Sequence, residues 1–228
     1  MKEKITDVFF DLDHTLWDFE KNSALTFEKV FHLNSLDIDM TRFLEIYSPI
    51  NFEYWERFRK DEISAIQLRH GRLKDSFVSL QFEASDDLIN TLSGQYVQYL
   101  PDFNHLYDGA FEILDYLKTN YKLHIITNGF QNVQDHKIKN SKLHSYFQSI
   151  TNSENAGFKK PNPKIFEFAL TLSKANKETS VMIGDSLEAD VQGALDFGME
   201  AIYFNEHKKE TPTSILQIST LHELKNIL

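Results

Sequence analysis

Residues 8–15 read Val8-Phe9-Phe10-Asp11-Leu12-Asp13-His14-Thr15, an apolar run that stops at two carboxylates set two positions apart. Such a run is typical of a buried strand in an open α/β sheet, and these sheets bind ligands beyond the carboxyl ends of their strands. The bend brings Asp11 and Asp13 close together, so their like charges call for a cation, a shared proton or a catalytic role. Ordinary turn chemistry after a strand is the alternative, and the rest of the chain must decide.

Composition indicates a globular protein with one large domain, or a medium domain that carries an insert. The chain has 228 residues, 41% of them hydrophobic, and no apolar stretch approaches the roughly 18 residues of a membrane span. The absence of cysteine excludes disulfides, thiolate metal sites and cysteine nucleophiles. A net charge of −10 argues against a nucleic-acid polymer as partner. An anionic substrate would need local positive charge, which a metal ion supplies most simply.

The amino-terminal residues 1–4 lead directly into the strand-like run and lack the apolar region of a signal peptide. Together with the absence of cysteine and of a membrane span, this favours a cytoplasmic protein that does not associate with membranes. We expect a monomer or a weak homodimer.

Residues 17–100 show apolar positions at three- and four-residue spacing, which predicts helices throughout. Ser64 with Gln67 resembles a capping box, Ser85 marks a further helix start, and Pro101 ends the block. Several helices without an intervening strand are typical of a bundle-like insert. We therefore expect an all-helical domain over these residues.

From residue 101 onward, strand and helix patterns alternate, which predicts a parallel sheet with helices on both faces. Strands are predicted at 123–126, near 150, at 181–183 and at 201–204, and helices at 108–119, at 133–143, after Pro163, at 187–197 and at 222–228. The expected fold class is α/β: a doubly wound, mainly parallel Rossmann-like core in residues 1–16 and 101–228, with the helical domain inserted after its first strand.

Polar residues with chemical uses follow three of the predicted strands. Asp11 and Asp13 follow the first, Thr127 and Asn128 the second, and Asp185 with Asp190 a third, while Lys160 lies in a loop before a helix. The carboxyl ends of parallel strands meet at one edge of a sheet, so these residues are expected to converge. Taken singly, each has an alternative reading as a turn, a helix cap or a surface residue. Their order and position together favour a site.

In these four segments the chain resembles the haloacid dehalogenase superfamily of phosphohydrolases. The superfamily's motifs Asp-x-Asp-x-Thr, Thr or Ser after the next strand, Lys before Pro, and Gly-Asp-x-x-x-x-Asp match, in order, Asp11, Asp13 and Thr15; Thr127; Lys160; and Gly184, Asp185 and Asp190. The helical insert resembles the small α-helical cap of that superfamily. The resemblance therefore covers essentially the whole chain.

The resemblance implies a phosphatase that works through an aspartyl-phosphate. Asp11 would be the nucleophile, and Asp13 the general acid and then the general base. Mg²⁺ would bind through the carboxylates of Asp11 and Asp185 and the backbone carbonyl of Asp13, all of them hard oxygen donors. Because an acid/base aspartate follows the nucleophile, the resemblance favours phosphoryl transfer over attack on carbon with loss of halide.

The same resemblance assigns the phosphoryl oxygens to the Thr127 hydroxyl, the Asn128 backbone amide and Lys160, which offset charge in the transition state. Asp190 is expected near the metal, and the resemblance leaves open whether it is a direct ligand.

Finer matches point to the substrate. Residues 11–18 and residues 127–130 with Gln134 look like the pyrimidine 5′-nucleotidase branch, which implies a small phosphate ester, a pyrimidine nucleoside 5′-monophosphate, as substrate. Aromatic residues near these motifs are suited to stack on a base, although with 19 Phe most aromatics must form the core. The candidates are Trp17, Phe19 and Phe130, with Asn51, Trp55, Arg69 and Arg72 in the helical domain.

Three alternatives remain: a sugar-phosphate phosphatase, a phosphomutase, and a non-catalytic phosphate-binding protein. The last should have lost a catalytic carboxylate, whereas Asp11, Asp13, Lys160 and Asp185 are all present. The sequence leaves open the exact substrate, the residues that contact its leaving group, and the oligomeric state.

Overall fold

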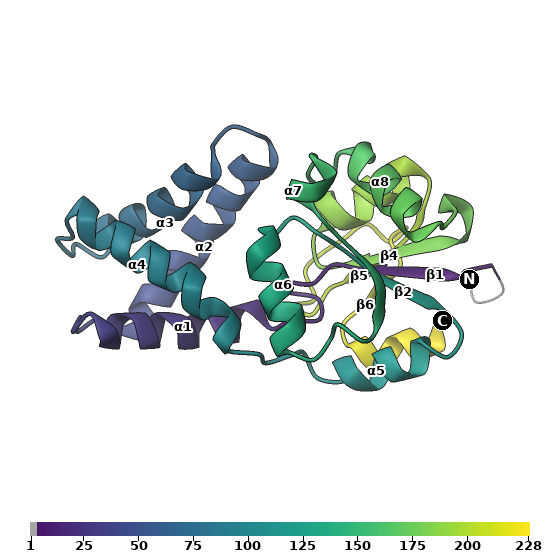
Figure 1. Ribbon diagram of the computed structural model, residues 1–228, viewed down its shortest axis with the longest axis horizontal. Coiled ribbons are helices and arrows are strands. Elements are labelled where there is room, and N and C mark those ends of the chain that lie inside the picture. Colours follow the sequence, from purple (N-terminus) through teal and green to yellow (C-terminus); the bar gives the residue numbers. More distant parts are fainter. Residues whose placement is uncertain (1–3) are drawn as a thin grey trace. The chain divides into compact units, whose positions relative to one another are not determined.

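The computed structural model describes residues 4–228, and residues 1–3, part of the predicted lead-in to the first strand, lie outside the described residues. Two compact units are present (Figure 1): residues up to Phe19 together with those from Asn104 onward, and Glu20–Phe103. The division thus falls at residues 19 and 103, whereas we expected it at 16 and 100. One reason is that Trp17 forms β-bridges with Asp13 and Leu106, which tie it to the first unit.

The first unit is built on a parallel sheet. In residues 4–228 its six strands run in the order β3-β2-β1-β4-β5-β6, and all neighbours are parallel. The strands are β1 (Asp7–Phe10), β2 (Lys122–Thr127), β3 (Phe147–Asn152), β4 (Ser180–Gly184), β5 (Glu200–Phe204) and β6 (Gln217–Ile218). β1 lies between β2 and β4, where the strand order reverses. Such a switch point opens the crevice in which doubly wound sheets bind ligands.

Helices cover both faces of this sheet, as Figure 1 shows for α8 on one side and α5 with the last helical segment on the other. The helices are α5 (Ala110–Leu117), α6 (Gln131–Asn140), α7 (Ser153–Ala156), α8 (Pro163–Ser173) and α9 (Gly193–Phe197). This arrangement confirms the predicted α/β, doubly wound fold class.

The strand β1 lies at the centre because every one of its residues is apolar or paired and all are buried. Phe9 packs into a cluster with Ile165 and Phe166 of α8. Phe10, which points to the opposite face, meets Phe147 edge-on at a centroid distance of 6.4 Å. A strand with large apolar residues on both faces is stable only where both faces are covered.

The structure differs from the predicted elements in several places. The predicted helix 187–197 begins as a π-helical segment, Leu187–Gln192, and only then continues as α9. The predicted last helix is a 3-10 helix over Leu221–Asn226. β6 and α7 were not predicted, because two to four residues are too few for a recognisable periodicity.

The second unit is helical, as predicted. Its helices are α1 (Phe19–Leu33), α2 (Met40–Arg59), α3 (Ala65–Ser79) and α4 (Asp86–Tyr99), followed by a short 3-10 helix over Leu100–Asp102. The predicted capping box of Ser64 and Gln67 is confirmed, and Ser85 caps α4. Within residues 4–228, none of the helices has both the length and the apolar character needed to cross a membrane.

Candidate active site

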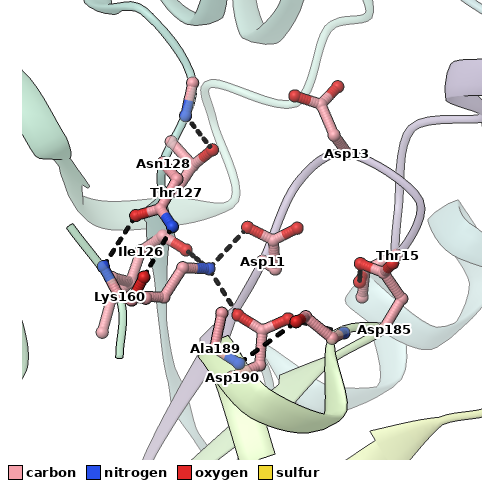
Figure 2. Close-up of polar contacts among 12 residues, drawn as sticks. Asp11, Asp13, Thr15, Ile126, Thr127, Asn128, Lys160, Asp185, Ala189 and Asp190 are labelled. Carbon is pink, nitrogen blue, oxygen red and sulfur yellow. Dashed lines mark hydrogen bonds and ion pairs between the residues drawn. The ribbon is translucent and has the colours of Figure 1, made fainter. Parts of the chain in front are cut away.

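The polar residues predicted to converge at the carboxyl edge of the sheet do lie together (Figure 2). The backbone amide of Asp11 donates to the carbonyl of Ile183 at 2.9 Å, which extends the pairing of β1 with β4 by one residue. The chain then turns at once, since the Leu12 carbonyl accepts from the amide of Trp17 at 2.9 Å. This bend leaves Asp11 buried, with 8% of its surface exposed, and Asp13 on the rim of the site.

Lys160 is held in place by Asn128, the residue after Thr127 at the end of β2. The Asn128 side chain donates to the Lys160 carbonyl at 2.9 Å and accepts from the Lys160 amide at 2.8 Å. These reciprocal bonds imitate a strand pair, so they fix the loop before α8 against the sheet. The Asn128 side chain therefore has a structural part that the sequence did not reveal.

The Lys160 ammonium sits at the centre of the site, 2% exposed. It donates to Asp11 Oδ1 at 2.7 Å and to the Ile126 carbonyl at 2.6 Å, and it lies 2.6 Å from Asp190 Oδ1. Burial by itself lowers the pKa of this ammonium, but the carboxylates of Asp11 and Asp190 outweigh burial and raise the pKa. Lys160 thus remains a cation beside Asp11.

Asp190 reaches the site from the π-helical segment that follows β4. Its backbone amide and that of Val191 both donate to the Ser186 carbonyl, at 3.0 and 3.2 Å, which widens this turn. The Asp190 carboxylate accepts in return from the Ser186 amide at 3.0 Å. A Cβ on Gly184 would lie 2.2 Å from Asp190 Oδ2, so only glycine leaves room for this carboxylate.

Three carboxylates converge in the site: oxygen atoms of Asp11, Asp185 and Asp190 lie within 4.8 Å of one another. Burial raises the pKa of Asp11 well above its ordinary value, against the lowering effect of Lys160, and Asp190 and Asp185 raise it further. Burial and Asp190 raise the pKa of Asp185 to about 7. With Lys160 as their only close cation among the described residues, these oxygens suit a divalent ion, and oxygen donors are those that Mg²⁺ prefers.

Thr127, at the end of β2, is buried with 1% exposed surface. Its hydroxyl oxygen accepts from the Gly129 amide at 3.1 Å and from the Gln134 side chain at 2.7 Å. The hydroxyl of Thr15, from the first motif, donates to Asp185 Oδ1 at 3.4 Å and so joins the loop after β1 to the loop after β4.

Asp13 has partners that the sequence only partly indicated. Lys137 of α6 donates to Asp13 Oδ1 at 2.6 Å, and Gln134 donates to Oδ2 at 2.7 Å. Gln134 was marked in the sequence only by a family resemblance, and Lys137 was not predicted. The signal that could have found Lys137 is a lysine on the apolar face of a predicted helix, four positions after Val133.

The remaining candidates have the following surroundings. Trp17 and Phe19 are buried, with the Lys137 ammonium 4.0 and 5.2 Å from their ring centroids. In the helical unit Arg72 donates to Asn51 at 2.7 Å. Phe130 lies at the N-cap position of α6 without a capping bond from its side chain, Trp55 packs edge-on against Phe58, and Arg69 is half-buried.

The chain is similar to known proteins over nearly its whole length. The model of the haloacid dehalogenase-like hydrolase family matches residues 8–204. The chain is 30% identical to the pyrimidine 5′-nucleotidase YjjG of Escherichia coli (strain K12), over 97% of this chain and 96% of that protein. It is 27% identical to a glyceraldehyde 3-phosphate phosphatase of Methanothermobacter thermautotrophicus, over 97% of this chain and 98% of that protein.

A solved structure, that of the HAD-hydrolase YfnB of Bacillus subtilis bound to magnesium, has a TM-score of 0.88 to this chain. It is 28% identical and covers 99% of both chains. The similarity therefore extends through both units of the molecule.

Proposed function

The chain belongs to the haloacid dehalogenase-like hydrolase family, and from this membership we propose a Mg²⁺-dependent phosphomonoester hydrolase that works through an aspartyl-phosphate and acts on pyrimidine nucleoside 5′-monophosphates. The observation that carries the proposal is the setting of Asp11: a buried carboxylate at the end of β1, held by Lys160 and flanked by Asp185 and Asp190. A nucleophile in phosphoryl transfer needs such a fixed position next to compensating positive charge.

Asp11 is suited to the attack because Lys160 binds one of its oxygens, Oδ1, and the second oxygen is directed away from the ammonium (Figure 2). In the first step a carboxylate oxygen of Asp11 bonds to phosphorus as the ester P–O bond breaks, and Asp13 gives its proton to the leaving alkoxide. In the second step Asp13 takes a proton from water, the water oxygen bonds to phosphorus, and the Asp11 carboxylate leaves.

Charge on the transferring phosphoryl group is offset by donors that this chain supplies. Lys160, the Thr127 hydroxyl and the Asn128 backbone amide are the proposed partners of its oxygens. Mg²⁺, held by the carboxylates of Asp11 and Asp185 and the carbonyl of Asp13, with Asp190 beside them, would add positive charge at the same oxygens. Asp190 is placed beside the metal in this proposal because its carboxylate contacts Lys160 and lies close to the carboxylates of Asp11 and Asp185.

The nucleotide substrate is supported by the similarity to a pyrimidine 5′-nucleotidase over nearly the whole chain. The similarity to a glyceraldehyde 3-phosphate phosphatase supports a small sugar phosphate as the second candidate. In this proposal the helical unit, Glu20–Phe103, is the cap domain that selects the leaving group. Because nucleotides are charged and do not cross membranes unaided, the proposed place of action is the cytoplasm.

The test measures phosphate release from UMP, dTMP, ribose 5-phosphate and glyceraldehyde 3-phosphate, with and without Mg²⁺. The wild-type protein is expected to prefer UMP and dTMP and to need Mg²⁺, whereas Asp11→Asn is expected to release no phosphate above background, because the nucleophile is lost. Asp135→Asn, an exposed position on α6, is the matched control and should behave as wild type. A clear preference for the sugar phosphates would refute the nucleotidase assignment, and turnover by Asp11→Asn would refute the aspartyl-phosphate mechanism.

A further inference from the structure

Lys137 is a second buried lysine near the site, and the reaction steps above give it no part. It lies on α6 with 2% of its surface exposed, and its ammonium is 2.6 Å from Asp13 Oδ1. Lys160, by contrast, contacts Asp11 and Asp190. The two lysines therefore divide the site: one is paired with the proposed nucleophile, the other with the proposed acid/base residue.

The surroundings of Lys137 fix where its ammonium can be. Nζ lies 4.0 Å from the centroid of the Trp17 ring and 5.2 Å from that of Phe19, distances at which a cation is attracted by an aromatic ring. Trp17 is in turn tied to the first unit by β-bridges to Asp13 and Leu106. The ammonium thus has aromatic neighbours that are themselves held in place.

The helix register adds a second contact to Asp13. Residues three apart on a helix lie on the same face, so Gln134 and Lys137 are presented together. Gln134 Nε2 donates to Asp13 Oδ2 at 2.7 Å and also to the Thr127 hydroxyl at 2.7 Å. Both oxygens of Asp13 are therefore bound by one face of α6, and that face is joined to the end of β2.

We propose that Lys137 is a positioning residue for the proposed reaction: its ammonium, with Gln134, holds the Asp13 carboxyl where it can exchange a proton with the leaving alkoxide. This inference rests on the proposed function. A small displacement of a proton-transfer group costs about 100-fold in rate, so a fixed carboxyl has a direct benefit. Stability alone does not explain Lys137, because apolar residues of similar volume often replace a buried ion pair without loss of stability.

The test compares two esters that differ in their need for the acid. The leaving group of UMP is the 5′-alkoxide of uridine, a poor leaving group that needs a proton. The leaving group of p-nitrophenyl phosphate is p-nitrophenolate, which is stable without one. The measured quantity is kcat/KM with saturating Mg²⁺, because kcat/KM reports the steps up to loss of the leaving group and excludes attack by water. Lys137→Met is expected to lower kcat/KM for UMP by about 10- to 100-fold and that for p-nitrophenyl phosphate by less than about threefold.

Lys137→Arg keeps the charge and is expected to recover most of the UMP activity, while Lys139→Met, at an exposed position of the same helix, should match wild type. Because Lys137 acts through Asp13, Lys137→Met should have little further effect in the Asp13→Asn background. Equal losses for the two esters in a folded Lys137→Met protein, or full additivity with Asp13→Asn, would overturn the inference. If Lys137→Met does not fold, Lys137→Gln replaces it under the same criteria.

The outcome for Lys137 is separable from that for the proposed function. A wild-type protein without Mg²⁺-dependent phosphatase activity would refute the proposed function itself. If wild type is active and Asp13→Asn lowers kcat/KM for UMP more than that for p-nitrophenyl phosphate, the acid role of Asp13 is supported, whatever the result for Lys137→Met.

Discussion

At the scale of single residues, Gly184 determines whether Asp190 can enter the site. Because a Cβ here would lie 2.2 Å from Asp190 Oδ2, Gly184→Ala must displace a carboxylate held by Lys160 and the Ser186 amide. We expect a loss of about 1–3 kcal/mol in the free energy of unfolding, as for other overpacked sites, together with slower Mg²⁺-dependent turnover. Urea unfolding and steady-state kinetics measure the two effects.

Gly94 provides the matched control for this substitution. It lies in α4, and a Cβ there would meet nothing within 4 Å. Gly94→Ala should therefore be neutral or more stable by up to about 1 kcal/mol, since alanine favours the helix. If Gly184→Ala matched Gly94→Ala in both measurements, the close approach of Asp190 would have no consequence.

At the scale of elements, His124 joins three strands. It is fully buried in β2, with Nε2 3.1 Å from Asp7 Oδ1 of β1 and Nδ1 2.8 Å from Ser149 Oγ of β3. Its ring stacks on Phe9 at 4.6 Å. Burial lowers the pKa of His124 below its ordinary value of 6.5, and Asp7 only partly opposes this effect. The neutral ring fits both contacts, because Nε2–H donates to Asp7 and Nδ1 accepts from Ser149.

Because of His124, we expect the free energy of unfolding to decrease in acid. Because the folded pKa is lowered, the unfolded chain takes up the proton first, so the stabilisation is full above about pH 6.5 and declines as the pH falls below it. The free energy of unfolding of wild type should drop between pH 7.5 and 5.5 by more than that of His124→Gln. His136→Gln, at an exposed histidine of α6, should keep the wild-type dependence. Identical pH dependence in wild type and His124→Gln would contradict the prediction.

At the scale of the whole molecule, the three carboxylates of Asp11, Asp185 and Asp190 bring together the loops that follow β1 and β4, which are more than 170 residues apart in the chain. The pKa of Asp185 is raised to about 7, chiefly by burial and then by Asp190. A carboxyl whose folded pKa is raised stabilises the fold when protonated, so without Mg²⁺ this contribution is lost as the pH rises through about 7. Mg²⁺ should replace the proton above that pH.

We therefore expect Mg²⁺ to raise the midpoint of thermal unfolding, and to raise it more at pH 8 than at pH 6, where protons compete for Asp185. At a concentration 100 times the dissociation constant, the stabilisation is about 2.7 kcal/mol. Asp185→Asn should remove most of the shift, and Asp115→Asn, an exposed and remote carboxylate, should retain it. A shift that is independent of pH, or that persists in Asp185→Asn, would count against a magnesium site here.

Much of the fold followed from local patterns. The apolar run ending at Asp11 predicted β1, the strand and helix alternation predicted the parallel sheet, and Ser64 and Ser85 predicted helix starts. These features depend on residues close together in the chain, so the sequence reveals them. The π-helical segment at Leu187–Gln192 was not predicted. Its wider turn depends on the packing of the Asp190 side chain against Gly184 and Lys160, which are distant in the chain or not part of the helix pattern.

By itself the sequence determined which residues can do chemistry and that they meet, because the carboxyl ends of parallel strands share one edge. Asp11, Thr127 and Asp185 were identified in this way, and Lys160 by the Lys-before-Pro motif in a loop before a helix. Only the tertiary structure decided how they are paired: Lys160 with Asp11 and Asp190, and Asp13 with Lys137, which lies 124 positions away in the chain. Such pairs depend on the face that a helix turns toward a distant loop, and this is set by packing over the whole unit rather than by local spacing.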